Sequence, residues 1–340
     1  MNRRIAILMA AVVVLGFTGT ARAQEVLLNG AGATFPYPIY SKWFDVYHKQ
    51  KPNAQINYQS IGSGGGIRQI LAGTVDFGAT DGPMTDEQLA QAKTKILHFP
   101  TVLGSVVPTY NIPGVTGELN FTAAALAGIY LGKITKWNDP EIAKSNSGFK
   151  LPDSDIVVVH RSDGSGTTYI WVDYLSKVSE EWKKKVGRNT SVNWPVGLGG
   201  KGNEGVSGLV KQTPNAIGYV ELIYALQTQQ SYGRVQNLSG AFVKADLAST
   251  TAAAVGAAKA MPEDFRVSIT NAPGEGAYPI ASFTWLLVPS TIGDAAKKTV
   301  LKEFVKWMLA EGQTYTESLG YARLPKEVVQ MELKAVGQIN

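Results

Sequence analysis

The chain has 340 residues, more than a single hydrophobic core usually accommodates, so length alone favours two domains. It contains no cysteine, which excludes disulfides, lipid attachment at an N-terminal cysteine, and cysteine-ligated zinc or iron–sulfur sites. The formal net charge is only +5 and the chain has no long run of Lys or Arg, so a nucleic acid is not an expected partner.

The N-terminal segment has the pattern of a secretion signal. Arg3 and Arg4 precede an apolar run over residues 5–16, which has the length of a signal core, and Ala-Arg-Ala ending at Ala23 fits a cleavage site. The alternative is a membrane anchor, but a spanning helix needs roughly 20 apolar residues. We therefore expect a cleaved signal peptide over residues 1–23 and a free periplasmic protein without a lipid anchor. Three arginines and no acid would leave with it, so the mature charge is 5 − 3 = +2.

Beyond the signal, the hydrophobic pattern alternates between strands and helices. The first part predicts strands over 27–31, 55–61 and 75–80 and helices over 35–50, 67–72 and 85–93. Thr85 with Gln88 forms a capping box at the start of the last helix. This alternation predicts an α/β domain.

The rest of the chain continues the alternation without any segment that resembles a flexible linker. The pattern predicts strands over 102–110, 155–160, 216–221 and 278–289, and helices over 121–131, 168–177, 206–212, 248–260 and 295–312. Without a linker, two lobes must be joined by strands that cross between them, and the candidates are Val102–Val107 and Ile280–Leu287. We therefore expect residues 24–103 plus 282–340 to form lobe 1 and residues 104–281 to form lobe 2.

Four segments place small or hydroxyl residues at the mouth of a predicted helix. They are Ala33-Thr34-Phe35, Gly62-Ser63-Gly64, Thr80-Asp81-Gly82 and Asp163-Gly164-Ser165-Gly166-Thr167. The first turn of a helix has unpaired N–H groups and a partial positive charge, so it attracts anions. Ordinary capping explains any one segment as well. Taken together, the four segments favour an anion site.

Other motifs are less informative. Arg161 stands just before the last of these segments and could bind an oxyanion, or form a salt bridge with Asp163, or both. The spacing Gly197-x-Gly199-x-x-Gly202 matches a dinucleotide fingerprint, but Pro195 makes the preceding stretch a poor buried strand. The histidines are scattered, and no metal or cofactor is expected.

Several motifs resemble the periplasmic phosphate-binding proteins of bacterial phosphate ABC transporters. They occur in the family's order along nearly the whole mature chain: Gly30-Ala31-Gly32-Ala33-Thr34-Phe35-Pro36, Gly62-Ser63-Gly64-Gly65, Asp76-Phe77-Gly78-Ala79-Thr80-Asp81, Ile129-Tyr130-Leu131-Gly132-Lys133-Ile134, Arg161-Ser162-Asp163-Gly164-Ser165-Gly166-Thr167 and Gly197-Leu198-Gly199-Gly200-Lys201-Gly202-Asn203. The resemblance implies a two-lobed α/β fold that closes over a dehydrated phosphate.

The resemblance also implies roles for individual residues. The hydroxyl and main-chain donors would be Thr34, Phe35, Ser63, Ser165, Gly166 and Thr167. Arg161 would be the arginine of the site and Asp81 its carboxylate, with Asp163 orienting Arg161 and Gly164 supporting the loop. Two positions depart from the family, because Gly64 stands where a serine is common and His160 where another arginine occurs in some members.

The carboxylate has a physical rationale. Phosphate near neutral pH keeps at least one P–OH, which ionised Asp81 can accept, whereas sulfate carries no proton and would face Asp81 with lone pair against lone pair. We expect a monomer that binds inorganic phosphate and delivers it to the permease subunits of an ABC importer with a cytoplasmic ATPase. A binder of another tetrahedral oxyanion and a phosphatase-like enzyme are the alternatives, although the chain lacks a plausible nucleophile–base pair.

Overall fold

A computed structural model of the protein describes residues 25–340. The predicted signal peptide lies outside the described residues. The strands are β1 (Val26–Gly32), β2 (Ala54–Ser60), β3 (Phe77–Thr80), β4 (Ile96–Asn111), β5 (Asn120–Phe121), β6 (Val157–Arg161), β7 (Leu198–Gly200), β8 (Ala216–Glu221), β9 (Ser231–Tyr232), β10 (Arg234–Gln236), β11 (Phe242–Val243) and β12 (Ala281–Pro289).

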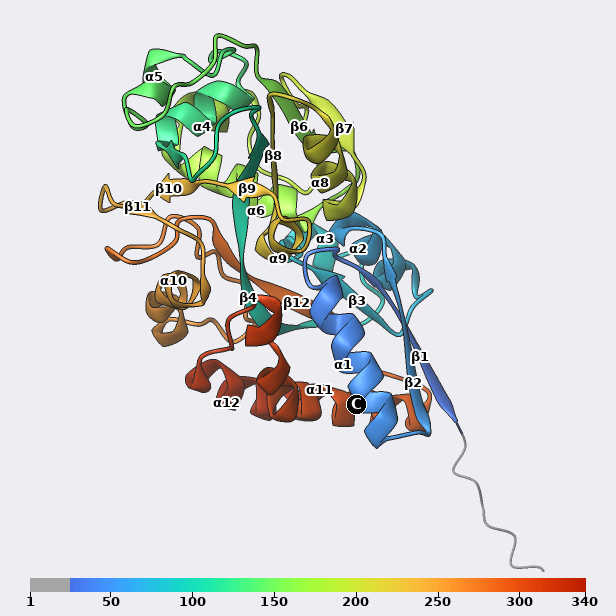
Figure 1. The fold of residues 1–340 in the computed structure, drawn as a ribbon. Helices are drawn as coiled ribbons and strands as arrows, with labels where there is room; N and C mark the ends of the chain where they lie inside the picture. The colour runs from blue at the N-terminus through green and yellow to red at the C-terminus, as the bar shows by residue number, and fades with distance from the viewer. Residues whose placement is uncertain (1–24) are drawn as a thin grey trace, which may run out of the picture.

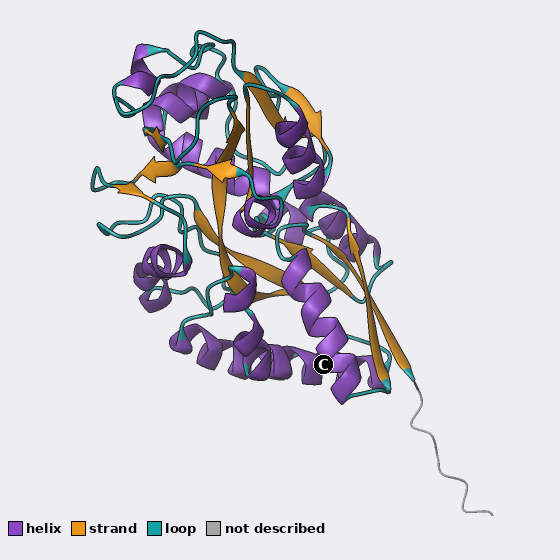
Figure 2. Cartoon of the chain, viewed as in Figure 1, coloured by secondary structure: helices purple, strands orange, loops and turns teal. Residues whose placement is uncertain are grey.

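The helices alternate with these strands (Figure 1, Figure 2). They are α1 (Tyr37–Gln50), α2 (Ser63–Ala72), α3 (Asp86–Leu89), α4 (Ala123–Tyr130), α5 (Pro140–Ala143), α6 (Gly166–Val178), α7 (Glu180–Lys185), α8 (Gly202–Gln212), α9 (Leu222–Gln227), α10 (Leu247–Lys259), α11 (Ala295–Leu309) and α12 (Lys326–Ala335), with 3-10 turns at Glu311–Tyr315, Glu317–Leu319 and Val336–Gln338.

One curled sheet runs through the whole molecule. Its strand order is β2-β1-β3-β12-β4-β8-β6-β7, with β9 added beside β4, and a separate small sheet has the order β11-β10-β5. At one end, β1 pairs in parallel with β2 and β3, as the strand–helix alternation of the first part requires. At the other end, β6 pairs in parallel with β7 and β8.

The strand β4 joins the two ends of this sheet. Its first part, Ile96–Ser105, pairs antiparallel with β12, and its second part, Val106–Asn111, pairs antiparallel with β8. Figure 1 shows β4 running from the lower part of the molecule, which holds both ends of the described chain, into the upper part. The predicted two-lobed α/β fold with crossing strands is therefore confirmed, and both predicted crossing segments fall mainly on β4 and β12.

The exact division between the lobes stays a prediction. Helix α10 packs against β4, β12 and α12, although the sequence division at residue 281 puts α10 and α12 in different lobes. Figure 1 likewise shows α10 beside the C-terminal helices.

Several predicted elements differ from the structure in their bounds, including β4, which begins at Ile96 and not at residue 102, and the following three helices. Helix α2 begins at Ser63, not at residue 67, so the glycine run is helical. Helix α8 begins at Gly202 and follows a short strand, β7, that was not predicted. Helix α3 ends at Leu89, earlier than expected, but its predicted capping box between Thr85 and Gln88 is present.

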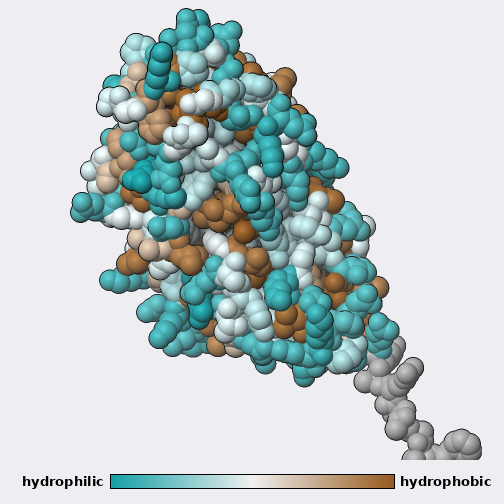
Figure 3. Space-filling view, in the orientation of Figure 1, coloured by the Kyte–Doolittle hydropathy of each residue, from teal (hydrophilic) through white to brown (hydrophobic). Residues whose placement is uncertain are grey.

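The core holds aromatic side chains on both sides of the crossing strands. Five tryptophans are almost fully buried, namely Trp43, Trp137, Trp171, Trp182 and Trp285. In Figure 3 most of the visible surface is hydrophilic or intermediate, and hydrophobic residues appear in patches, with larger ones near the middle of the molecule. Among residues 25–340 no helix is long and apolar enough to cross a bilayer.

Candidate functional site

The predicted anion-binding segments meet between the two lobes. Gly166, at the start of α6, faces Asp81 and Ser63 so closely that a β-carbon on it would lie 2.5 Å from Asp81 Oδ2 and 2.5 Å from Ser63 Oγ. Main-chain Gly64 N donates to Gly164 O at 2.9 Å. The starts of α2 and α6, which are about 100 residues apart in sequence, therefore touch each other at the same place as Asp81.

Main-chain N–H groups at these helix starts are available as donors. Four buried residues have main-chain N–H groups without a hydrogen-bond acceptor among residues 25–340. They are Phe35, Ser63, Gly166 and Thr167. A helix leaves its first N–H groups unpaired, and burial denies them water, so an anion at this point would satisfy them.

Asp81 is the acidic group of the site. Its side chain is almost fully buried, its Oδ1 accepts from Thr284 Oγ1 at 2.7 Å, and its Oδ2 lies 3.4 Å from Ser63 Oγ. Burial raises the pKa of Asp81 to about 7, although the hydroxyl of Thr284 and the positive charge of Arg161 both act to lower it. The carboxyl therefore gains or loses its proton near neutral pH.

Arg161 is buried at the end of β6 and paired with Asp163. Its Nε donates to Asp163 Oδ1 at 2.8 Å and its Nη2 to Asp163 Oδ2 at 2.6 Å, while its Nη1 is buried and without a partner in the described chain. Burial alone would raise the pKa of Asp163, but the hydrogen bonds and charge of Arg161 outweigh it and hold that pKa below its ordinary value. Asp163 thus fixes two nitrogens of Arg161 and leaves the third free for a ligand.

The hydroxyl groups of the site are also fixed by neighbours. Ser165 caps α6, because its Oγ accepts from Thr168 N at 3.0 Å. Thr34 Oγ1 and Thr167 Oγ1 both accept from the amide of Asn203, at 2.8 Å and 3.2 Å. In each case an acceptor position of the hydroxyl is used, and its hydrogen remains available to donate.

The departures from the family pattern have structural explanations. A β-carbon on Gly64 would lie 3.0 Å from Gly164 Cα, so a side chain here would press against the facing loop. His160 points away from the anion-binding groups, because its ring stacks on Trp194 with centroids 4.8 Å apart and its Nδ1 lies 3.0 Å from Arg161 O. Neither position contributes a donor to the site.

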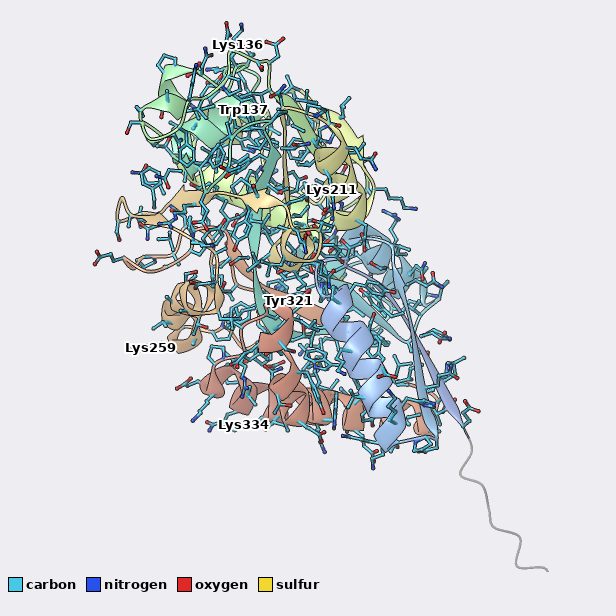
Figure 4. The ribbon with its side chains drawn as sticks, in the orientation of Figure 1. Lys136, Trp137, Lys211, Lys259, Tyr321 and Lys334 are labelled. Carbon is cyan, nitrogen blue, oxygen red and sulfur yellow. The ribbon has the colours of Figure 1, made fainter. Side chains whose placement is uncertain are left out.

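Four residues near the site were missed from the sequence. Asn203 and Thr284 form hydrogen bonds with predicted anion-binding residues, Thr34 and Asp81 respectively. Tyr224 OH donates to Thr34 O at 2.5 Å, and Tyr321 OH donates to Phe35 O at 2.6 Å, so two tyrosines hold the turn before α1. Figure 4 labels Tyr321, which lies in the middle of the molecule near α1. Asn203 lay in a glycine motif and Thr284 in a predicted crossing strand, but neither residue was assigned a role in the site from the sequence.

The dinucleotide alternative is not supported by the site. The glycine segment does form a strand and a helix start, β7 and α8, but Gly202 N donates to Asp163 Oδ1 at 3.1 Å and Asn203 contacts Thr34. The start of α8 therefore packs against the anion-binding residues of both lobes.

Comparison with known proteins agrees with this architecture. A family model described as the PBP superfamily domain matches residues 18–311, which places the chain in that class of two-lobed binding proteins. Phosphate-binding protein PstS of Xylella fastidiosa (strain Temecula1) is 48% identical over 310 residues, which cover 91% of this chain and 84% of the relative. The corresponding protein of Pasteurella multocida is 47% identical over 315 residues, which cover 92% and 90%. The chain belongs to this PstS family of phosphate-binding proteins.

Solved structures share the fold. A high-affinity periplasmic phosphate-binding protein bound with phosphate matches with a TM-score of 0.72 and 21% identity, over 90% of this chain and 93% of that chain. A phosphate-binding protein from Stenotrophomonas maltophilia matches with a TM-score of 0.69 and 17% identity, over 91% and 94%.

Proposed function

We propose that this protein binds inorganic phosphate between its two lobes and delivers it to a membrane ABC importer. The observation that carries the proposal is the presence of one buried carboxyl, Asp81, among buried donors that have no partner in residues 25–340. The PstS name of relatives 44–48% identical to this chain supports the same conclusion.

The protons of the ligand explain why an anion site contains an acid. A donor set of main-chain N–H groups, hydroxyls and Arg161 Nη1 suits the oxygens of any tetrahedral oxyanion. Asp81 Oδ2 adds an acceptor, and only an anion that still carries a proton can donate to it. Phosphate and arsenate keep a proton near neutral pH, whereas sulfate does not. Sulfate would bind without repulsion only if Asp81 were itself protonated.

The phosphate-binding residues in this proposal are those expected from the sequence. They are Thr34, Phe35, Ser63, Asp81, Arg161, Ser165, Gly166 and Thr167, with Asp163 and Gly164 in support. These residues come from segments before and after β4, and so from both predicted lobes. This supports binding by lobe closure, in which residues 24–103 plus 282–340 move against residues 104–281. The mature protein would act as a periplasmic monomer, after removal of residues 1–23, and would release phosphate to permease subunits driven by a cytoplasmic ATPase.

The enzyme alternative has less support. Among residues 25–340 no group of three or more His, Cys, Asp or Glu side chains is placed to hold a metal ion. The hydroxyls nearest the site do not face a histidine, since His160 stacks on Trp194. Incubating the mature chain with a chromogenic phosphate ester tests this alternative, and sustained turnover would support it.

The function is tested by calorimetric titration of the mature chain with phosphate, arsenate and sulfate at one ionic strength and at about pH 9, where Asp81 is largely ionised. We expect one phosphate per monomer with micromolar affinity or tighter, about −8 kcal/mol or better, similar binding of arsenate, and much weaker binding of sulfate. Equal affinity for sulfate would favour a general oxyanion binder, and absence of phosphate binding would refute the proposal.

Lobe closure is tested separately by small-angle X-ray scattering. Because candidate donors come from both lobes, saturation with phosphate should reduce the radius of gyration. Unchanged dimensions at saturation would contradict closure while leaving phosphate binding itself intact.

A further inference from the structure

Asn203 links the two lobes at the candidate site. It is the second residue of α8, and its side chain is fully buried. Its Nδ2 donates to Thr34 Oγ1 at 2.8 Å and to Thr167 Oγ1 at 3.2 Å, and its main-chain N lies 3.4 Å from Thr34 Oγ1. One asparagine therefore contacts a hydroxyl from each of the two predicted lobes.

The orientation of this amide is fixed by the main chain. Asn203 Oδ1 accepts from Glu221 N at 3.1 Å, so the oxygen points to β8 and the nitrogen points to the two threonines. The preceding residue is held as well, because Gly202 N donates to Asp163 Oδ1 at 3.1 Å. Both N–H bonds and the oxygen of the amide have partners, which leaves no reason for the amide to flip.

This arrangement determines which way the threonine hydroxyls point. A hydroxyl has one hydrogen and two lone pairs. Thr34 Oγ1 receives two N–H groups from Asn203, so both of its lone pairs are occupied and only its hydrogen is free. Thr167 Oγ1 receives one N–H group. The lone pairs that accept from Asn203 cannot face an anion. Each hydroxyl is therefore left to donate its hydrogen to the ligand.

We propose that Asn203 is a positioning residue for anion binding, which orients the hydroxyls of Thr34 and Thr167 as hydrogen-bond donors toward the ligand and completes the contact between the closed lobes. Asn203 does not itself bind the anion in this proposal. The proposal rests on phosphate binding as the function of the site.

The first test compares two variants of Asn203 by phosphate calorimetry and thermal denaturation. Asn203→Leu keeps the approximate volume but removes the amide, and it should weaken phosphate binding by about tenfold or more, the value of one misdirected hydrogen bond to a charged ligand. Asn203→Asp should weaken binding further, because a carboxylate accepts the hydroxyl hydrogens and turns them away from the anion. If leucine prevents folding, Asn203→Ser makes the same comparison.

The matched control is Asn146→Asp. Asn146 is also buried and fully bonded, with Nδ2 donating to Asn120 O at 2.8 Å and Ile142 O at 2.9 Å, and Oδ1 accepting from Asn120 N at 2.8 Å. It lies beside α5 and β5, away from the anion-binding residues. Asn146→Asp should lower the melting temperature and leave the phosphate dissociation constant within about twofold of the unmodified chain.

A double-mutant cycle separates positioning from general support. Thr34→Val should weaken phosphate binding by about tenfold in the unmodified chain, but by about threefold or less when Asn203 is already leucine, because the hydroxyl is no longer oriented. Equal losses in both backgrounds, or native affinity in Asn203→Leu, would overturn the proposal. If the unmodified chain bound no phosphate, the proposed function would fail instead, so the two failures are distinguishable.

Discussion

Replacing Asp81 with asparagine should alter the selectivity of the site between phosphate and sulfate. The structure determines how the new amide would sit. Thr284 Oγ1 donates to Oδ1 of Asp81 at 2.7 Å, so the amide oxygen would take that position and the NH₂ group would take the position of Oδ2, beside Ser63 and Gly166. An acceptor that faces the ligand is thereby exchanged for a donor.

The size of the effect follows from this exchange. Sulfate gains one hydrogen bond to a charged group, worth about 1.5–3 kcal/mol, and no longer faces a carboxylate. Phosphate loses the acceptor for its P–OH but gains a donor for an ionised oxygen, so its affinity should change modestly. The ratio of the sulfate to the phosphate dissociation constant should therefore fall by about tenfold or more, since 1.4 kcal/mol corresponds to a factor of ten.

The assay is competitive calorimetry of both anions against the unmodified chain and Asp81→Asn, at one salt concentration and at about pH 9, where Asp81 of the unmodified chain is largely ionised. Asp173→Asn is a suitable control, because Asp173 is equally buried but is bonded to Arg188, Ser268 and Thr270 away from the site. The control should lose stability without a change in the ratio. If sulfate remains equally excluded by Asp81→Asn, Asp81 is not the selectivity element, and cavity size or the other donors must account for discrimination.

Three further results are expected. The affinity of the unmodified chain for sulfate should fall about tenfold per pH unit above pH 7, because Asp81, whose pKa is raised to about 7, must be protonated to donate to sulfate. Sulfate itself does not titrate in this range, so a flat pH profile would argue against this role of Asp81. Arg161→Ala should weaken phosphate binding by about 1.5–3 kcal/mol in calorimetry while circular dichroism stays native, whereas native affinity would mean that Arg161 serves only as the partner of Asp163. Glu332 is fully buried, both of its carboxyl oxygens are unpartnered in the described chain, and burial raises its pKa well above the ordinary value. The favourable contribution of the protonated carboxyl to stability is therefore complete below about pH 4.3 and is lost as the pH rises toward the folded-state pKa. Glu332→Gln should therefore raise the melting temperature relative to the unmodified chain at pH 8 but not at pH 4, and equal melting temperatures at pH 8 would contradict this.

Hydrophobic periodicity predicted most strands and helices because these elements are buried on a regular face. Strand β8 was predicted with its observed bounds, residues 216–221, and the start of α11 at residue 295 was also correct. The start of α2 was missed because a glycine run suggests a loop. In the structure these glycines allow close packing, since a β-carbon on Gly66 would lie 2.6 Å from Gly32 Cα on β1.

The site was predictable where its residues follow one another in the chain. Helix starts with small and hydroxyl residues indicated an anion site, and the structure brings Ser63, Asp81 and Gly166 together. The residues that support them come from distant segments: Tyr224 reaches Thr34 across 190 positions and Tyr321 reaches Phe35 across 286. No local pattern encodes such contacts, because they depend on how the lobes meet.

The shared strand β4 also bears on how the protein unfolds. Its 16 residues supply a central strand to each lobe, paired with β12 in one and with β8 in the other. If either lobe lost its sheet, β4 would lose half of its ladder and expose a buried strand edge to water within the lobe that remained. If the lobes move against each other during binding, as proposed above, the shared strand would still make them melt in a single cooperative transition.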